Sequence, residues 1–255
     1  MIIDAFTFWC EFDMLELRLS ILDKYVDKFI LVESNQTFSG NPKPLFYEKN
    51  KDKFAKWNDK IIHIVVPNIQ TNNLFERHYL CYEAIENKIM EIGNPEDIAF
   101  CSDLDEIWNP EIIGKCDDEI HSLAQFNYSY WLNNRASEQW VGTLMSKVKN
   151  FFVGHNKINR TAKPNLLPNG GWHFTNMGGA DMVINKIQAY DHADEAVAGL
   201  GRFKDFGIRE RMNANEDYLG RLTDYYGKPY TFWKDESDWP QYLKDNKEKW
   251  SFLCK

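Results

Sequence analysis

The first half of the chain alternates short apolar runs with longer stretches in which apolar residues recur at helical spacing. The apolar runs predict strands at residues 2–8, 29–33, 61–66 and 98–101. The stretches between them predict helices, and the longest of these covers residues 72–92. Strands that alternate with helices in this way are typical of a parallel sheet with right-handed crossovers, so the sequence predicts the α/β class.

The second half is less regular. Two further runs, at residues 121–131 and 140–148, predict strands that pair antiparallel across a turn. Residues 170–179 are rich in glycine and aromatic side chains, and helices are expected from about residue 181 and over residues 208–226. Because no linker, repeat or low-complexity stretch interrupts the pattern, we expect a single domain built on a Rossmann-like mixed sheet.

Composition narrows the class of partner. The net charge is −8, and Lys and Arg are scattered, so no basic stripe is available to neutralise a nucleic-acid backbone. Aromatic residues reach 15%, which suits a carbohydrate site but is also typical of an aromatic core. The five cysteines lack CxxC spacing, and no apolar run approaches the roughly 20 residues of a membrane span. We therefore expect a soluble, cytoplasmic protein with no nucleic-acid partner and no membrane span.

The strongest local signal is Asp103-Leu104-Asp105, a DxD motif that directly follows the fourth predicted strand. Ligands of parallel sheets gather at the carboxyl ends of the strands, where two such carboxylates can share one hard cation. Mg²⁺ or Mn²⁺ prefers these oxygen ligands and leaves positions for phosphate oxygens and water. The motif alone is weak, because roughly one or two matches occur by chance in a chain of this size. A solvated acidic turn is the alternative.

Three other kinds of protein share parts of this pattern. A phosphohydrolase of the haloacid-dehalogenase kind carries DxD after its first strand, whereas here it follows the fourth. A nucleotidyltransferase would show a glycine-rich basic loop after the first strand, where residues 9–13 are acidic and contain no glycine. A non-catalytic sugar-nucleotide-binding protein on the same fold is the third alternative, and binding without turnover would favour it.

Four blocks of sequence follow one another in a specific order: residues 4–8 with 11–19, 29–33 with 37–45, 102–107, and 171–174. In this order and spacing they resemble glycosyltransferase family 17, the family of the bisecting β-1,4-mannosyl-glycoprotein N-acetylglucosaminyltransferase. The resemblance extends from about residue 3 to about residue 221. One departure is Trp108, which stands where the family usually has proline.

The resemblance implies a fold of the nucleotide-diphospho-sugar transferase (GT-A) type and inversion at the anomeric carbon. It also implies a UDP-sugar donor, with UDP-GlcNAc favoured, and a glycan or glycoconjugate acceptor. On this basis residues 1–107 are expected to bind the nucleotide-sugar, and residues 108–255 to bind the acceptor and supply the catalytic groups.

An inverting transfer needs a cation that offsets the charge of the leaving diphosphate, and we expect Mn²⁺ or Mg²⁺ in this role. Asp105 is expected to bind the metal ion directly, and Asp103 to bind the ribose or a metal-bound water. His173 is expected to contact the donor or the metal ion, because the glycines before it let the backbone approach a ligand. Trp172 is assigned with it to the donor site. A packed, satisfied imidazole is the alternative for His173.

The same reaction needs a carboxylate that takes the proton of the acceptor hydroxyl. Asp217 resembles the acidic position late in this fold that often houses the base, and Glu216 and Asp194 are the reserve candidates. An acidic residue near a helix start is often a plain cap, which is the alternative for Asp217.

Three further residues are expected at the donor site. Glu33 ends the second predicted strand, where this fold usually holds the uridine, although a structural carboxylate fits equally well. Lys43 and Arg77 are candidates for phosphate contacts, but exposed basic residues are common. Aromatic side chains in the second half are candidates for the floor of the acceptor site: Tyr130, Trp131 and Trp140.

Overall fold

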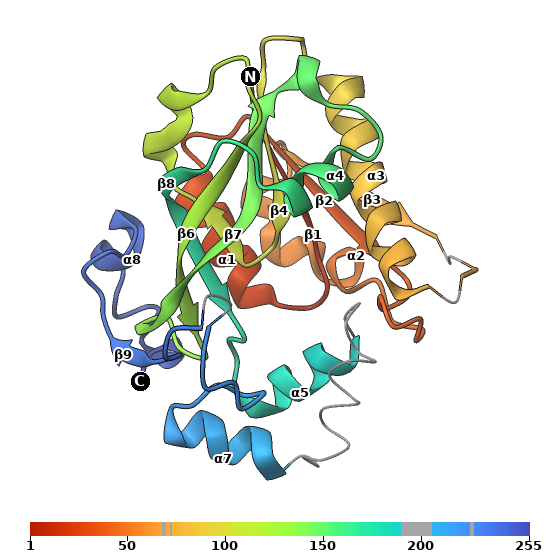
Figure 1. Cartoon of the computed structure of the whole chain (residues 1–255). Helices are drawn as coiled ribbons and strands as arrows, with labels where there is room; N and C mark the ends of the chain where they lie inside the picture. The colour runs from red at the N-terminus through yellow and green to blue at the C-terminus, as the bar shows by residue number, and fades with distance from the viewer. Residues whose placement is uncertain (68–69, 72, 190–205, 225–226) are drawn as a thin grey trace.

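The structure, a computed structural model, describes residues 1–67, 70–71, 73–189, 206–224 and 227–255 (Figure 1). Within these residues the centre is one mixed sheet of nine strands in the order β3-β2-β1-β4-β7-β6-β8-β5, with β9 paired to β7. The predicted α/β class and mixed sheet are confirmed. The strands are β1 (Ile2–Thr7), β2 (Lys28–Ser34), β3 (Ile61–Val66), β4 (Ile98–Asp103), β5 (Glu106–Trp108), β6 (His121–Ser129), β7 (Asn134–Lys147), β8 (Leu167–Thr175) and β9 (Phe232–Lys234).

The first four strands run parallel, as predicted, and both faces of this part of the sheet are covered. Along β2, Phe29 and Leu31 pack with helix α1 (Phe12–Leu22), whereas Ile30 packs on the opposite face with helix α3 (Leu74–Ile92). Successive side chains of a strand point to opposite faces. A strand covered on both faces therefore has to be apolar throughout, which explains why these strands could be identified from apolar runs.

The helices form where the sequence offers start signals. Asn73 caps α3, because its side-chain oxygen accepts hydrogen bonds from the backbone N–H groups of Phe75 and Glu76. None of the helices in the described part of the chain is long and apolar enough to cross a membrane. The other helices are α2 (Phe46–Asn50), α4 (His155–Ala162), α5 (Ala180–Ala189), α7 (Phe206–Ala214) and α8 (Gln241–Asp245), with 3₁₀ turns at Lys51–Trp57, Pro110–Lys115, Val148–Asn150 and Ser251–Leu253.

In the second half, one stretch had no predicted secondary structure and one predicted helix needs correction. The glycine-rich stretch 170–179 is largely strand β8, and Gly171 is needed there because a Cβ at this position would lie 2.2 Å from the carbonyl oxygen of Ile107 on β5. The helix predicted over 208–226 ends at Ala214. Asn215, with φ of 60°, adopts the left-handed conformation that commonly stops a helix.

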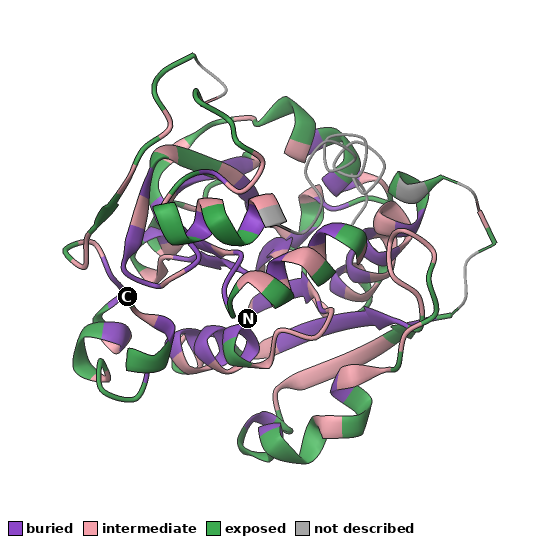
Figure 2. Cartoon of the chain, turned by 90° about the horizontal axis from the view of Figure 1, so that it is seen from below, coloured by how far each residue is buried: buried purple, intermediate pink, exposed green. Residues whose placement is uncertain are grey.

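The connection from β4 to β5 curls the sheet. β5 begins at Glu106, three residues after the end of β4, yet it pairs with β8 at the other end of the strand order. The β5 end of the strand order therefore lies close to the end of β4, and residues 103–106 lie where strands from both halves of the chain meet. Figure 2 shows buried residues along the strands of the sheet and exposed residues mainly on the outer helices and loops.

Candidate active site

A cavity of about 320 Å³ opens at the carboxyl edge of the parallel strands. Helix α5 contributes to its wall, and Figure 1 shows this helix lying across that edge of the sheet. Ligands of open α/β sheets bind at this edge, so the cavity is the candidate active site. The last residues of five strands line it: Thr7, Ser34, Asp103, Ser129 and Thr175.

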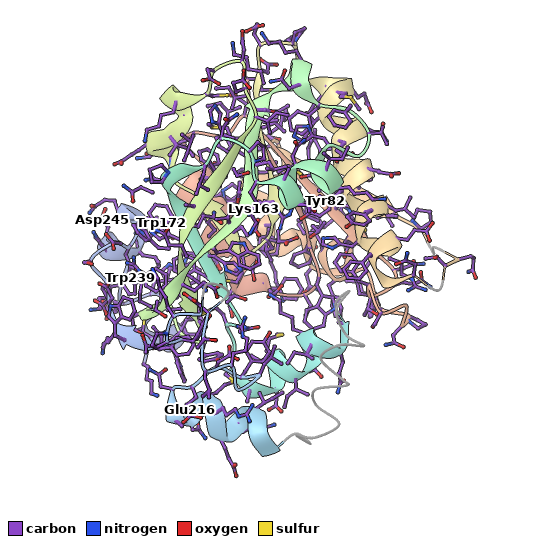
Figure 3. All side chains as sticks on the ribbon, in the orientation of Figure 1. Tyr82, Lys163, Trp172, Glu216, Trp239 and Asp245 are labelled. Carbon is purple, nitrogen blue, oxygen red and sulfur yellow. The ribbon has the colours of Figure 1, made fainter. Side chains whose placement is uncertain are left out.

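Asp103 forms an ion pair at the base of the cavity. Its carboxylate accepts hydrogen bonds from Arg160 Nη2 at 2.9 Å, from the hydroxyl of Tyr82 at 2.8 Å and from that of Thr7 at 3.3 Å (Tyr82 is labelled in Figure 3). Burial alone would raise the pKa of Asp103, but the positive charge of Arg160 helps to hold it well below its usual range. Asp103 is therefore an ionised, firmly oriented group.

Glu106 is completely buried beneath Asp103 and shares its partner. Its carboxylate accepts hydrogen bonds from both terminal nitrogens of Arg160, at 2.9 and 3.0 Å, and from Trp140 Nε1 at 2.6 Å. Gly142 makes this arrangement possible, because a Cβ at that position would lie 2.0 Å from Glu106 Oε1. Glu106 therefore fixes Arg160 and Trp140 around the cavity.

Asp105 has a different partner, Lys186 on α5. Lys186 Nζ donates to Asp105 Oδ2 at 2.7 Å and to Glu11 Oε1 at 2.8 Å. Burial would raise the pKa of Asp105, yet the positive charge of Lys186 helps to lower it overall. The pKa of Glu11 is raised, because burial outweighs its pairing with Lys186. Burial would lower the pKa of Lys186, but the two carboxylates raise it above its ordinary value. The ammonium is therefore held firmly between two acids.

His173 lies beside this group. Its Nε2 is 3.7 Å from Asp105 Oδ1, and its ring stacks on Trp140 with 4.5 Å between the ring centroids. Burial lowers the pKa of His173 by more than the neighbouring carboxylates raise it, so the imidazole is neutral at neutral pH. Its Nδ1 is buried and has no hydrogen-bond partner among the described residues.

The model of glycosyltransferase family 17 matches residues 1–255, the whole chain. The chain belongs to glycosyltransferase family 17. Among curated proteins, none matches it. A solved structure, titled "Crystal structure of 4-diphosphocytidyl-2C-methyl-D-erythritol synthase", is similar over 66% of this chain and 89% of its own, with 13% identity and a TM-score of 0.42. That likeness is too distant to carry an argument about activity.

In this family 17 chain the three predicted metal ligands do not form one site. Asp103 is bound to Arg160, Asp105 to Lys186, and His173 stands 3.7 Å from Asp105. Among the described residues, no group of three or more His, Cys, Asp or Glu side chains is arranged to hold a metal ion. As they are placed, the predicted ligands do not fit a divalent cation.

Some of the residues predicted to bind the donor line the cavity and others do not. Lys43 lies on the cavity wall with His173 and the DxD acids, whereas Glu33, Arg77 and Trp172 do not. Glu33 is buried, and its carboxylate accepts hydrogen bonds from the backbone N–H groups of Tyr47 and Glu48 at the start of α2, at 3.2 and 3.0 Å. His63 Nε2 lies 2.9 Å from it on the neighbouring strand. Glu33 thus caps a helix, which is the structural role that the sequence left open.

Arg77 and Trp172 also have structural contacts. Arg77 Nη1 donates to the carbonyl oxygen of Phe38 at 3.1 Å and braces the loop after β2. Trp172 packs in the main core, and its Nε1 donates to the carbonyl oxygen of Asp238. Figure 3 shows Trp172 on the side of the sheet near α8, where Trp239 also lies. Because neighbouring residues of a strand face opposite ways, Trp172 and His173 do not both reach the cavity.

Of the candidate bases, Asp217 lines the cavity. Arg221 binds it with two nitrogens, Nε at 3.1 Å and Nη2 at 2.8 Å, and the backbone N–H groups of Leu219 and Arg221 donate to Oδ1. Asp217 therefore also organises the turn that follows it. No helix starts at Asp217 in the described residues, so it is not a helix cap. Glu216 is exposed at the end of α7 (Figure 3), and Asp194 lies outside the described residues.

Three residues at or beside the cavity were not predicted from the sequence: Glu11, Arg160 and Lys186. Glu11 follows the first strand, at the edge where ligands are expected, so its position was a usable signal. Arg160 lies on α4, a helix that the sequence analysis did not predict, and Lys186 lies on a helix whose docking on the sheet is set by tertiary contacts. Trp140, one of the three aromatic candidates for the acceptor floor, does line the cavity.

Proposed function

We propose that this protein transfers a sugar from a UDP-sugar, with UDP-GlcNAc favoured, to a hydroxyl group of a glycan acceptor with inversion of configuration. The observation that carries the proposal is the composition of the cavity. The DxD acids, two lysines and the candidate base Asp217 meet in one space at the carboxyl ends of the strands. Membership of a glycosyltransferase family supports the reaction class.

The donor nucleoside is proposed to lie against the segment that follows β2. Residues 36–38 line the cavity there, and Phe38 stacks on His78 with 4.6 Å between their ring centroids. Lys43 lies on the same wall and supplies a positive charge. This side of the cavity thus offers hydrogen-bonding groups, a flat aromatic surface and a cation, which are the groups that a nucleoside diphosphate requires.

The acceptor is proposed to lie between Trp140 and Asp217. Trp140 is 37% exposed and presents an indole whose orientation is fixed by Glu106, so it offers an apolar surface for a sugar ring. Asp217 is the proposed base for the attacking hydroxyl. Its ion pair with Arg221 holds the carboxylate in a fixed orientation at the cavity wall.

A requirement for Mn²⁺ or Mg²⁺ remains a prediction from the sequence. The predicted ligands Asp103, Asp105 and His173 do not form one site, so the proposed reaction does not use a divalent ion. The charge of the leaving diphosphate then has to be offset by the side chains of the cavity.

The proposal is tested first by binding. UDP, UDP-GlcNAc, UDP-glucose, CDP, GDP and ADP are added separately, with EDTA or with Mn²⁺, and the unfolding temperature is measured. A UDP compound at a concentration 100 times its dissociation constant should stabilise the protein by about 2.7 kcal/mol. If every nucleotide and nucleotide-sugar leaves the unfolding temperature unchanged under both conditions, the proposed function is wrong.

The base is tested by comparing Asp217→Asn with Glu216→Gln, measuring the release of UDP in the presence of glycan acceptors. We expect Asp217→Asn to bind the donor as the wild type does but to lose transfer by at least about 100-fold, the usual contribution of a general base. Glu216→Gln should remain active, because this side chain is exposed at the end of α7. Full activity of Asp217→Asn would rule out the assignment. Binding of donor without turnover by the wild type, with every acceptor, would favour the non-catalytic alternative.

A further inference from the structure

We propose that Lys186 is a donor-binding residue whose ammonium group binds the diphosphate in place of a divalent metal ion, so that nucleotide binding does not require metal. This inference rests on the proposed function and deepens it. It starts from the position of the ammonium, which lies between the second acid of the DxD motif and Glu11. In a metal-dependent site, the cation is expected at that second acid.

The position of the ammonium is fixed from two sides. Glu11 follows β1 and Asp105 follows β4, and these strands are neighbours in the sheet, with Thr7 paired to Asp103. Both acids are therefore held by the sheet, and Lys186 reaches them from α5 with only 23% of its side chain exposed. A lysine ammonium has three N–H donors, and these two acids account for two of them among the described residues.

Each acid of the DxD motif has its own cation, and Lys186 is the cation at the second acid, Asp105. Asp103 shares Arg160 with the buried Glu106, so this guanidinium already serves two carboxylates. Arg221 is already paired with Asp217, to which it donates from two nitrogens. Lys186 and Lys43 are the lysines that line the cavity in the described part of the chain. Two lysines on one cavity match the two negative charges of a diphosphate bridge.

The competing explanation is structural, with Lys186 only tying α5 to the sheet. Helices α5 and α7 share a small core of their own, which includes Val183, Ile187 and Met212 and is separate from the two cores of the sheet. An ion pair across this boundary would hold the layer in place without touching a ligand. The two explanations predict different effects on binding when the ammonium is removed. A diphosphate-binding role predicts weaker binding of UDP but not of uridine, which lacks the phosphates.

The experiment measures dissociation constants for UDP and for uridine by calorimetry, in EDTA and in Mn²⁺. We expect wild-type protein to bind UDP equally well under both conditions. Lys186→Ala should raise the dissociation constant for UDP by about 10- to 100-fold, the range for a lost charge-assisted hydrogen bond. The dissociation constant for uridine should stay unchanged. Propylammonium should restore part of the UDP affinity of this variant. Lys249→Ala, which removes a lysine paired with Glu16 and 47% exposed, is the matched control and should behave as wild type.

Two results would overturn the inference while leaving the proposed function intact. One is that wild-type protein binds UDP only with Mn²⁺ present. The other is that Lys186→Ala loses affinity for UDP and for uridine to the same extent, or keeps its affinity for both. If wild-type protein binds no nucleotide or nucleotide-sugar under any condition, this inference and the proposed function are both wrong.

Discussion

Replacing Arg160 with methionine is the sharpest test of how the floor of the cavity is built. The guanidinium donates three hydrogen bonds of 2.9 to 3.0 Å to Asp103 and Glu106, and only 17% of its side chain is exposed. In Arg160→Met these acids lose their shared cation. Glu106 keeps Trp140, Thr143 and one backbone N–H as donors, but a buried negative charge is left without a counter-charge.

Removing one partner of a buried ion pair costs about 3–5 kcal/mol. The side chain of Asp103 is 31% exposed, so water screens part of that charge and we expect the lower end, about 3 kcal/mol. For a protein of this size that corresponds to a fall in unfolding temperature of roughly 6–12 °C. Lys157→Met, at an exposed position on the same helix, changes the unfolding free energy by less than about 0.5 kcal/mol and is the control.

The pH dependence of the unfolding free energy shows whether the loss comes from the unpaired carboxylate of Asp103. In the wild type the pKa of Asp103 is held below its unfolded value, so this group contributes stability above pH about 4 and loses it as the pH falls through the folded pKa. In the variant, burial without the guanidinium raises the pKa of Asp103, so this carboxylate takes up its proton at a higher pH. The stability difference between wild type and variant should therefore be largest at pH 7.5 and narrow towards pH 4.5.

Urea denaturation of both proteins at these two pH values measures the difference. The double variant Arg160→Met with Asp103→Asn should be more stable at pH 7.5 than the single variant, because the amide removes one unpaired charge. A loss below about 1 kcal/mol at pH 7.5, or a gap that widens as the pH falls, would refute the reasoning.

Two further predictions concern packing and capping. Gly142→Ala places a methyl group 2.0 Å from Glu106 Oε1 and should cost about 1–3 kcal/mol in urea denaturation, whereas Gly114→Ala, with nothing within 4 Å among the described residues, should be nearly neutral. Asn73→Ala removes the cap of α3 and should cost about 1 kcal/mol, with Asn73→Asp retaining most of the stability; equal losses in the two variants would contradict the capping role.

The elements that could be predicted from the sequence share one physical feature: their buried apolar residues recur at a regular spacing along the chain. β1, β2 and β4 are covered on both faces, so their apolar runs stand out, and α3 has one apolar face and an asparagine cap. Strand β8 was missed because its Asn-Gly-Gly composition has low strand propensity. Position 171 has to be glycine because β5 passes so close to it. The sequence of β8 alone does not predict that β5 lies there.

The candidate site was predictable at the strand ends and much less so elsewhere. Asp103 ends β4, Asp105 follows it, and Lys43 lies in the loop after β2. Sheet topology alone brings such positions to the cavity. Glu33 also ends a strand, yet its side chain turns to the start of α2, because a helix N-terminus offers N–H donors to a carboxylate. Position along a strand thus predicts where a side chain starts, whereas its partners decide where it points.

The same distinction applies inside the DxD motif. Asp103 and Asp105 stand on either side of the buried Leu104, and each has its own resident cation. Arg160 comes from 57 residues later in the chain than the first acid, and Lys186 from 81 residues later than the second. The motif as read from the sequence is equally compatible with two acids on one metal ion and with two separate ion pairs. The information that separates these arrangements lies in how α4 and α5 dock on the sheet, so a test at Lys186 decides more about this site than a further substitution within the motif.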